Sequence, residues 1–116
     1  MLPKENRLTK NQFQRLGKQG KKYRGDYGML VVERQEEVVP KFGFVVSKKI
    51  GNAVQRHRMT RLLREISRKY IKDTSNMGVI YIAYKYCENY KELEKDTSQS
   101  FENAIRDFKT DRVKSN

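Results

Sequence analysis

The sequence contains very few residues that could cross-link the chain or bind a metal ion. Its 116 residues include one cysteine, Cys87, and one histidine, His57. An internal disulfide needs two cysteines, and a structural zinc site needs about four thiolate or imidazole ligands. Neither feature can form within this chain, so we expect no metal ligands. A single thiol is typical of a reducing compartment, and we therefore expect the protein in the cytoplasm.

Long apolar segments are also missing. No apolar run approaches the roughly 20 residues that a membrane-spanning helix requires. The first ten residues are polar and lack the apolar core of a secretory signal peptide. We expect neither a signal peptide nor a membrane span. The length suits one domain over residues 1–116, with a polar tail that frays from about residue 110.

Acidic residues are scarce relative to basic ones. The chain has 26 Lys and Arg against 14 Asp and Glu, which gives a formal charge of +12. The excess lies in two blocks: residues 1–25 contain eight basic and one acidic residue, and residues 41–72 contain ten and one. Nucleic acid is the natural partner for such a charge, because each neutralised phosphate releases a counterion. An anionic membrane surface is the competing interpretation, but it requires an exposed amphipathic segment.

Hydrophobic periodicity predicts the element order α-β-β-α-β-α, which indicates a single small α+β domain with a mixed sheet. Thr9 is expected to cap the first helix and Gly20 to end it, while Asn52 is expected to cap the second. The first two strands are expected to pair as a hairpin around an acidic turn. The predicted elements are a helix up to residue 18, strands over 27–34 and 41–47, a helix over 53–72, a strand over 78–86 and a helix over 90–109.

The predicted helix over 53–72 is amphipathic, with an unusually uniform charge. On a helical wheel, one arc is apolar and the opposite arc is almost entirely basic, with Glu65 as the only acidic residue in the segment. A helix face that is merely solvated usually mixes charges of both signs. Arginine also suits phosphates better than lysine does, because its planar guanidinium donates in pairs. The pattern favours an RNA-binding face, with a solvated face as the alternative. The basic arc contains Arg61, Arg64, Arg68 and Lys72, flanked by Arg58 and Lys69.

The stretch around the start of this helix resembles the signature of the bacterial ribonuclease P protein family. Residues 45–54 read VVSKKIGNAV and run into RHR at 56–58, Arg61 and Arg64-Glu65. The family typically shows a strand ending in Ser-Lys-Lys, a Gly-Asn-Ala-Val turn and a helix opening with Arg-Asn-Arg. The pair Arg7-Leu8, ahead of a short helix with Phe13, is similar to the family's N-terminal segment. The resemblance therefore covers essentially the whole chain.

The resemblance implies a protein subunit of the ribonucleoprotein endonuclease ribonuclease P. Such a subunit binds the catalytic RNA and the 5′ leader of precursor tRNA, and it assists removal of the leader. One protein per RNA is expected, with Mg²⁺ bound mainly by the RNA. The arginine-rich helix is expected to follow a left-handed β-α-β crossover, an exception to the usual right-handed rule. The implied RNA-binding residues are Lys48, Lys49, Asn52, Arg56, His57, Arg58, Arg61, Arg64 and Arg68.

The resemblance also implies a cleft between the first helix and the sheet that accepts the single-stranded leader. Phe13 matches an aromatic residue of that cleft, and aromatic stacking is a common way to hold unpaired bases. Gly17 stands where a second aromatic residue is common, and Tyr81 is a possible replacement. An ordinary core position is an equally good interpretation for Phe13 and for Tyr81. The sequence also departs from the family at His57, where asparagine is usual, and at Thr60, where lysine is frequent.

Two other functions are alternatives to this interpretation. A protein nuclease would need a positioned histidine, paired carboxylates or a metal cluster. His57 is isolated within a basic helix, so we expect no catalytic residues in the protein and cleavage by the RNA with Mg²⁺. A small ribosomal protein or RNA chaperone would share the size, charge and fold class. Only the signature argues against that second alternative.

Overall fold

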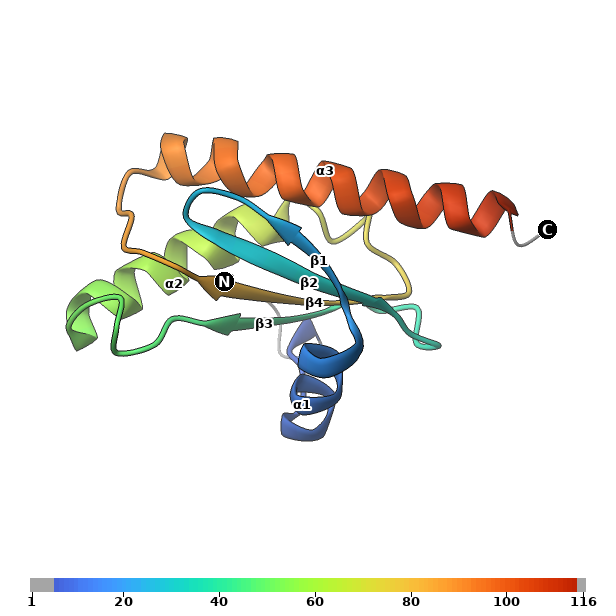
Figure 1. The fold of residues 1–116 in the computed structure, drawn as a ribbon, viewed down its shortest axis with the longest axis horizontal. Helices are drawn as coiled ribbons and strands as arrows, with labels where there is room; N and C mark the ends of the chain where they lie inside the picture. Colours follow the sequence, from blue (N-terminus) through green and yellow to red (C-terminus); the bar gives the residue numbers. More distant parts are fainter. Residues whose placement is uncertain (1–5, 115–116) are drawn as a thin grey trace.

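A four-stranded sheet separates one helix from the other two in the computed structural model, which describes residues 6–114 (Figure 1). Helix α1 (Lys10–Gln19) lies on one face of the sheet. Helices α2 (Ala53–Arg68) and α3 (Tyr90–Lys114) lie on the other face. The strands are β1 (Lys21–Arg24), β2 (Gly28–Arg34), β3 (Lys41–Val45) and β4 (Met77–Ala83), arranged in the order β1-β2-β4-β3.

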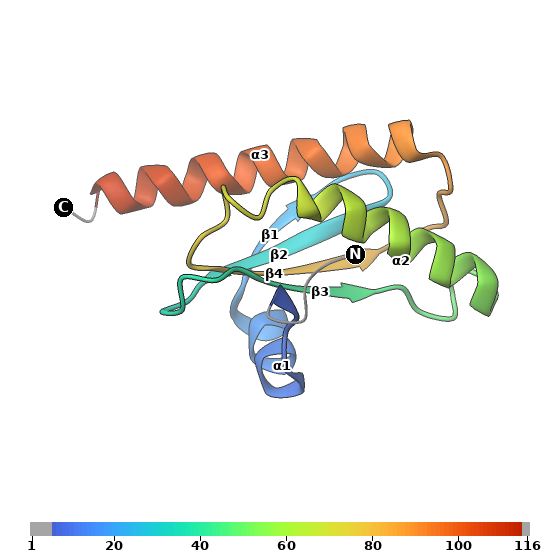
Figure 2. The ribbon, with the colours of Figure 1, turned by 180° about the vertical axis from the view of Figure 1, so that it is seen from behind.

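The strand pairing confirms a mixed sheet but contradicts the expected hairpin. Strands β1 and β2 form the antiparallel hairpin, while β2 pairs antiparallel with β4 and β3 pairs parallel with β4. The prediction that β2 and β3 pair with each other is wrong, because β4 lies between them. The chain passes from β3 through α2 to its parallel neighbour β4. Followed through Figures 1 and 2, this crossover is left-handed, as the family resemblance implied.

Strand β1 was not predicted. Three of its four residues are exposed lysines or arginines, and only Tyr23 points into the core. A strand with a single apolar residue has no detectable alternation of hydrophobicity. Charged side chains are typical of edge strands, because they discourage pairing with another chain. The element order is therefore α-β-β-β-α-β-α.

Side chains cap the first two helices as predicted. The Thr9 hydroxyl accepts from the Gln12 N–H at 3.3 Å, and the Gln12 side chain accepts from the Thr9 N–H at 2.9 Å. Asn52 and Gln55 form the same reciprocal pair at the start of α2, at 2.8 and 3.0 Å. Each pair satisfies two backbone N–H groups that have no partner within the helix. Gly20 ends α1.

The ends of α2 and α3 differ from the predicted ones. Helix α2 ends at Arg68, four residues before the predicted end, and residues 69–73 form turns. Helix α3 continues to Lys114 instead of ending at Lys109. Fraying from residue 110 stays a prediction, and residues 115–116 lie outside the described residues. Although α3 is 25 residues long, none of the described helices is long and apolar enough to cross a membrane.

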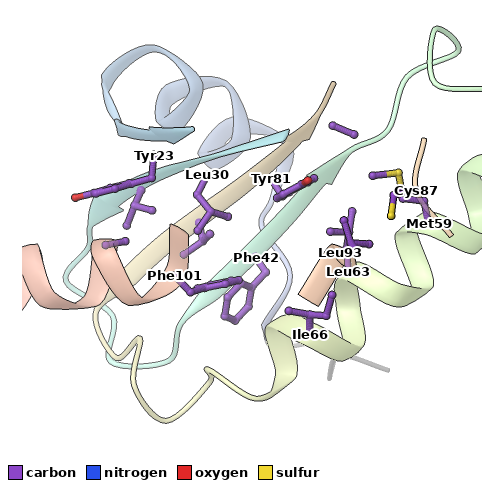
Figure 3. Packing of buried hydrophobic residues seen from close by; sticks show 14 of the residues in the cluster. Tyr23, Leu30, Phe42, Met59, Leu63, Ile66, Tyr81, Cys87, Leu93 and Phe101 are labelled. Atoms are coloured by element: carbon purple, nitrogen blue, oxygen red, sulfur yellow. The ribbon is translucent and has the colours of Figure 1, made fainter. Parts of the chain in front are cut away.

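The main core lies between the sheet and the helix pair α2–α3 (Figure 3). Leu63 and Ile66 of α2 are completely buried there, as is Leu93 of α3. The ring of Phe101 stacks on Tyr70, with a centroid distance of 4.5 Å and an interplanar angle of 9°. Burial of each such side chain contributes roughly 1.5–3 kcal/mol. This packing fixes which side of α2 faces outward.

A smaller core lies on the other face, beneath α1. It contains Leu16 together with Val31 of β2 and Ile80 of β4, and Phe13 packs against it. Phe13 lies directly over the backbone of β3, where a Cβ atom on Gly43 would overlap its ring. The glycine thus allows α1 to approach the sheet closely.

Candidate nucleic-acid interface

The outward side of α2 presents a row of arginines. Burial of Leu63 and Ile66 against the sheet turns Arg61 and Arg68 into solvent, while Arg64 is partly exposed. Residues three and four apart lie on one face of a helix, so these three side chains are neighbours. Within the described residues, none of the three forms a hydrogen bond or an ion pair. Their guanidinium groups are therefore available to an anionic partner.

Two cationic side chains beside this row, Arg58 and Lys69, instead have acidic partners in α3 or in the segment that leads into it. Arg58 Nη1 donates to Glu88 Oε2 at 2.7 Å, and this hydrogen bond lowers the pKa of the Glu88 carboxyl. Lys69 donates to Glu94, which raises the pKa of Lys69, and its ammonium lies 5.3 Å from the ring centroid of Tyr90. The predicted RNA-binding residue Arg58 thus differs from the unpaired row, because its guanidinium already has a carboxylate partner.

The loop before α2 contributes further exposed cations. Lys48 and Lys49 are exposed, while the adjacent Ile50 is buried and its N–H donates to the Ser47 carbonyl at 2.9 Å. The Asn52 side-chain oxygen is occupied by the helix cap, so its NH₂ group is the part that could donate to a ligand. The loop is therefore anchored to the core and carries its lysines beside the α2 N-terminus.

Arg56 and His57 occupy different environments although they are adjacent. Arg56 is half-buried, and its Nε has no hydrogen-bond partner within the described residues. Thr60 is uncharged and does not extend the basic row. Its hydroxyl donates to the Arg56 carbonyl at 2.8 Å. His57 is exposed. An open hollow of about 560 Å³ on this side of α2 is lined by His57, Arg58, Arg61, Leu62, Arg64 and Glu65.

On the opposite face of the sheet, one row of side chains is left uncovered by α1. The register places Arg24, Met29, Ile82 and Val45 side by side across the four strands. The three apolar residues are half-buried, pack against the α1 core and lie beside Phe13, which is also half-buried. Arg24 is exposed at the edge. Sequence reasoning identified Phe13 but missed the apolar row, although strand alternation would have shown it once the covered face was known.

Tyr81 does not belong to this face. It is 2% exposed and lies in the main core with Leu93 and Phe101, on the side of the sheet opposite to Phe13. Burial raises the pKa of its hydroxyl. The prediction that Tyr81 forms a stacking platform beside Phe13 is wrong, because β4 alternation directs this residue toward α2 and α3. The interpretation as a core residue is the one that the structure supports.

The arrangement is suited to binding a polyanion. Among residues 6–114, no three His, Cys, Asp or Glu side chains gather into a group that could hold a metal ion. His57 forms no hydrogen bond with a carboxylate in that part of the chain. The described residues therefore offer a basic helix on one side of the sheet and an apolar strip beside an aromatic ring on the other.

Comparisons with known proteins agree with this geometry. A family model described as Ribonuclease P matches residues 2–107. The ribonuclease P protein component of Fusobacterium nucleatum is 38% identical over 107 residues, which cover 85% of this chain and 96% of the relative. The RNase P protein of Staphylococcus aureus is 26% identical, with a TM-score of 0.73 over 90% of this chain and 93% of that one. The RNase P protein of Thermotoga maritima, at 19% identity, shares the fold, with a TM-score of 0.69 over 80% of this chain and 92% of that one.

Proposed function

Because the chain belongs to the ribonuclease P protein family, we propose that it joins two RNAs: its α2 side docks on a catalytic ribonuclease P RNA, and its α1 face holds the 5′ leader of precursor tRNA. As a ribonuclease P protein component, it is a subunit of an endoribonuclease that processes tRNA, and it binds RNA.

The unpaired arginine row supports the proposal that α2 binds the catalytic RNA. Arg61, Arg64 and Arg68 share one side of a rigid helix and have no carboxylate partner within the described residues. A surface that kept these charges for solubility alone would be expected to balance them with acidic neighbours. Bidentate donation to phosphates would neutralise the row and release counterions. Lys48 and Lys49 extend the same surface toward the start of α2.

The face beneath α1 supports the proposal for the leader. Phe13 presents part of an aromatic ring, and the adjacent row of Met29, Ile82 and Val45 is apolar and half-exposed. Unpaired bases stack on aromatic rings in a sequence-tolerant manner, and the apolar row continues the surface beside the ring of Phe13. Arg24 closes the row at the sheet edge, where it could neutralise a leader phosphate. The two proposed surfaces lie on opposite faces of one sheet, so one subunit can contact both RNAs at once.

Cleavage itself is assigned to the RNA. We expect Mg²⁺ to be held mainly by RNA phosphates, where it stabilises the attacking and leaving oxygens. The protein's contribution is binding and positioning, with one protein per catalytic RNA. We place this reaction in the cytoplasm, where the buried thiol of Cys87 would stay reduced.

Reconstitution tests the proposal directly. The purified protein is added to a bacterial ribonuclease P RNA at a Mg²⁺ concentration at which the RNA alone cleaves precursor tRNA slowly. We expect the protein to restore cleavage and to make the holoenzyme bind precursor tRNA more tightly than mature tRNA. A variant with Arg61, Arg64 and Arg68 replaced by glutamine serves as the matched control and should restore little activity. Equal stimulation by this variant would contradict docking through α2.

A further inference from the structure

Tyr84 has no role in the structure described so far, yet it is prominently exposed. Four large apolar side chains stand out in this way in the described part of the chain, and Tyr84, at 47% exposure, is the aromatic one. It follows the last residue of β4. Its side chain forms no hydrogen bond and no ring contact within the described residues. An exposed, unengaged ring beside a proposed nucleic-acid path is a candidate contact for a base.

Strand alternation places Tyr84 on the α1 face. Ile80 and Ile82 point to that face, whereas Ala83 belongs to the main core on the other face. The pairing with β2 continues past the strand end, because the Tyr84 N–H donates to the Tyr27 carbonyl at 2.7 Å. A residue that remains paired keeps the alternation of its strand. The Tyr84 side chain therefore leaves the sheet on the side of Ile82.

The next residue confirms the alternation independently. Lys85 Nζ lies 5.1 Å from the ring centroid of Tyr27, and the Tyr27 hydroxyl donates to Glu92 of α3 at 3.0 Å. Lys85 is thus directed toward α3, and Tyr84, one residue earlier, is directed away from it.

We propose that Tyr84 is a second stacking platform for the 5′ leader, at the far end of the apolar row from Phe13. The proposal rests on the leader-binding function proposed above. Phe13 lies over Gly43, which pairs with Ile80. Tyr84 is four residues after Ile80, one residue past the end of β4. At about 3.3 Å per residue, the two backbone positions are about 13 Å apart along the strand. That distance corresponds to about four nucleotides at a stacked spacing of about 3.4 Å.

The ring of Tyr84 takes the place of a second aromatic residue in α1. Phe13 is the only aromatic residue of α1. Gly17 is exposed, and a Cβ atom added there would meet nothing within 4 Å. Tyr84 supplies a ring from the sheet instead, with Ile82 between it and the α1 core. A tyrosine ring stacks on any base, so this platform would recognise an unpaired strand with little sequence preference.

The test compares Tyr84→Ala, Tyr84→Phe, Phe13→Ala and the control Val38→Ala, which removes an exposed apolar side chain from the β2–β3 turn. Each protein is assembled with a bacterial ribonuclease P RNA. Affinity is then measured for mature tRNA and for precursors with leaders of one to ten nucleotides. Tyr84→Ala should weaken binding of long-leader precursor about five- to tenfold, the lower range for loss of one stacked base. Tyr84→Phe and Val38→Ala should bind like wild type, and mature tRNA should be unaffected throughout.

Leader length and abasic nucleotides locate the contact. The Tyr84→Ala loss should begin at a leader length about four nucleotides different from the Phe13→Ala loss. One abasic position should weaken wild type and leave no further effect for Tyr84→Ala. A loss that is equal for mature tRNA, a Tyr84→Phe variant that behaves like alanine, or the absence of any such abasic position would overturn the proposal.

Failure of this proposal is distinguishable from failure of the proposed function. If wild type discriminates precursor from mature tRNA and Phe13→Ala loses that discrimination while Tyr84→Ala keeps it, the leader site stands and the Tyr84 platform is refuted. If wild type binds both tRNAs equally, the proposed leader function fails, and the Tyr84 proposal fails with it.

Discussion

Removing one arginine of the α2 row should weaken RNA binding and also make it less sensitive to salt. Arg61, Arg64 and Arg68 have no carboxylate partner within the described residues, so loss of one removes a contact to the partner without exposing an unpaired acid. Each phosphate contact contributes about 0.7–0.9 to the slope of log affinity against log salt. Raising salt from about 50 to about 200 mM should therefore weaken an alanine variant about threefold less than wild type.

The assay is a titration of catalytic RNA with each protein at several salt concentrations. Lys95→Ala is a suitable control. Lys95 is exposed on the side of α3 that faces Asp26 and Tyr27 in the β1–β2 turn, away from α2. It also removes one positive charge, so it corrects for the change in net charge. Single alanine variants of the row that match wild type in both affinity and slope would refute the assignment of this surface.

Four further substitutions test catalysis and stability. His57→Ala should leave the single-turnover cleavage rate of the saturated holoenzyme nearly unchanged, whereas a loss of about a hundredfold or more would reveal a general base. Gly43→Ala should lower the free energy of unfolding by about 1–3 kcal/mol in urea titrations, because the added Cβ atom would overlap the ring of Phe13 in α1. Gly17→Ala should instead stabilise α1 by about 0.5–1 kcal/mol, because a Cβ atom there meets nothing within 4 Å. Arg58 lowers the pKa of Glu88 in the folded state, so their pairing contributes stability above the ordinary carboxyl pKa of 4.5 and loses it as pH falls below that value. Thermal midpoints of Glu88→Gln should therefore fall less than those of wild type between neutral and acid pH, and identical acid profiles would contradict the pairing.

Local sequence signals were sufficient for α1 and for the start of α2. Thr9 and Asn52 lie directly before amphipathic segments, and a cap depends only on residues within one turn. Gln12 and Gln55, three residues after each cap, complete the sequence signature of a reciprocal cap.

Strand pairing could not be derived in the same way. The two strands that flank the acidic turn are neighbours in sequence, but β4 comes between them from more than 30 residues further along the chain. Strand β1 is held by pairing with β2 rather than by its own apolar residues, of which Tyr23 is the only buried one. The position of β4 depends on pairing that is distant in sequence, whereas β1 belongs to a local hairpin. Alternation of hydrophobicity reports neither interaction.

The same difference between local and distant interactions applies to the candidate surfaces. The basic side of α2 was predictable because one helix has one buried side. That Arg58 and Lys69 are paired was not, because their acidic partners lie 30 and 25 residues away. Tyr81 of β4 and Tyr84, which directly follows this strand, show the same limit: alternation separates them onto two faces, but only the positions of α1 and α3 determine which face is core.

The segment from β3 into α2 belongs to both proposed surfaces. Val45 ends β3 on the α1 face, and Arg61 lies on the outward side of α2, with the loop between them pinned by buried Ile50. A short stretch of chain therefore crosses from one side of the molecule to the other. Because β3 and α2 pack on the same core, that core holds the two proposed surfaces at a fixed distance from each other. In the proposed complex, the protein would act as a rigid spacer between the leader and the catalytic RNA.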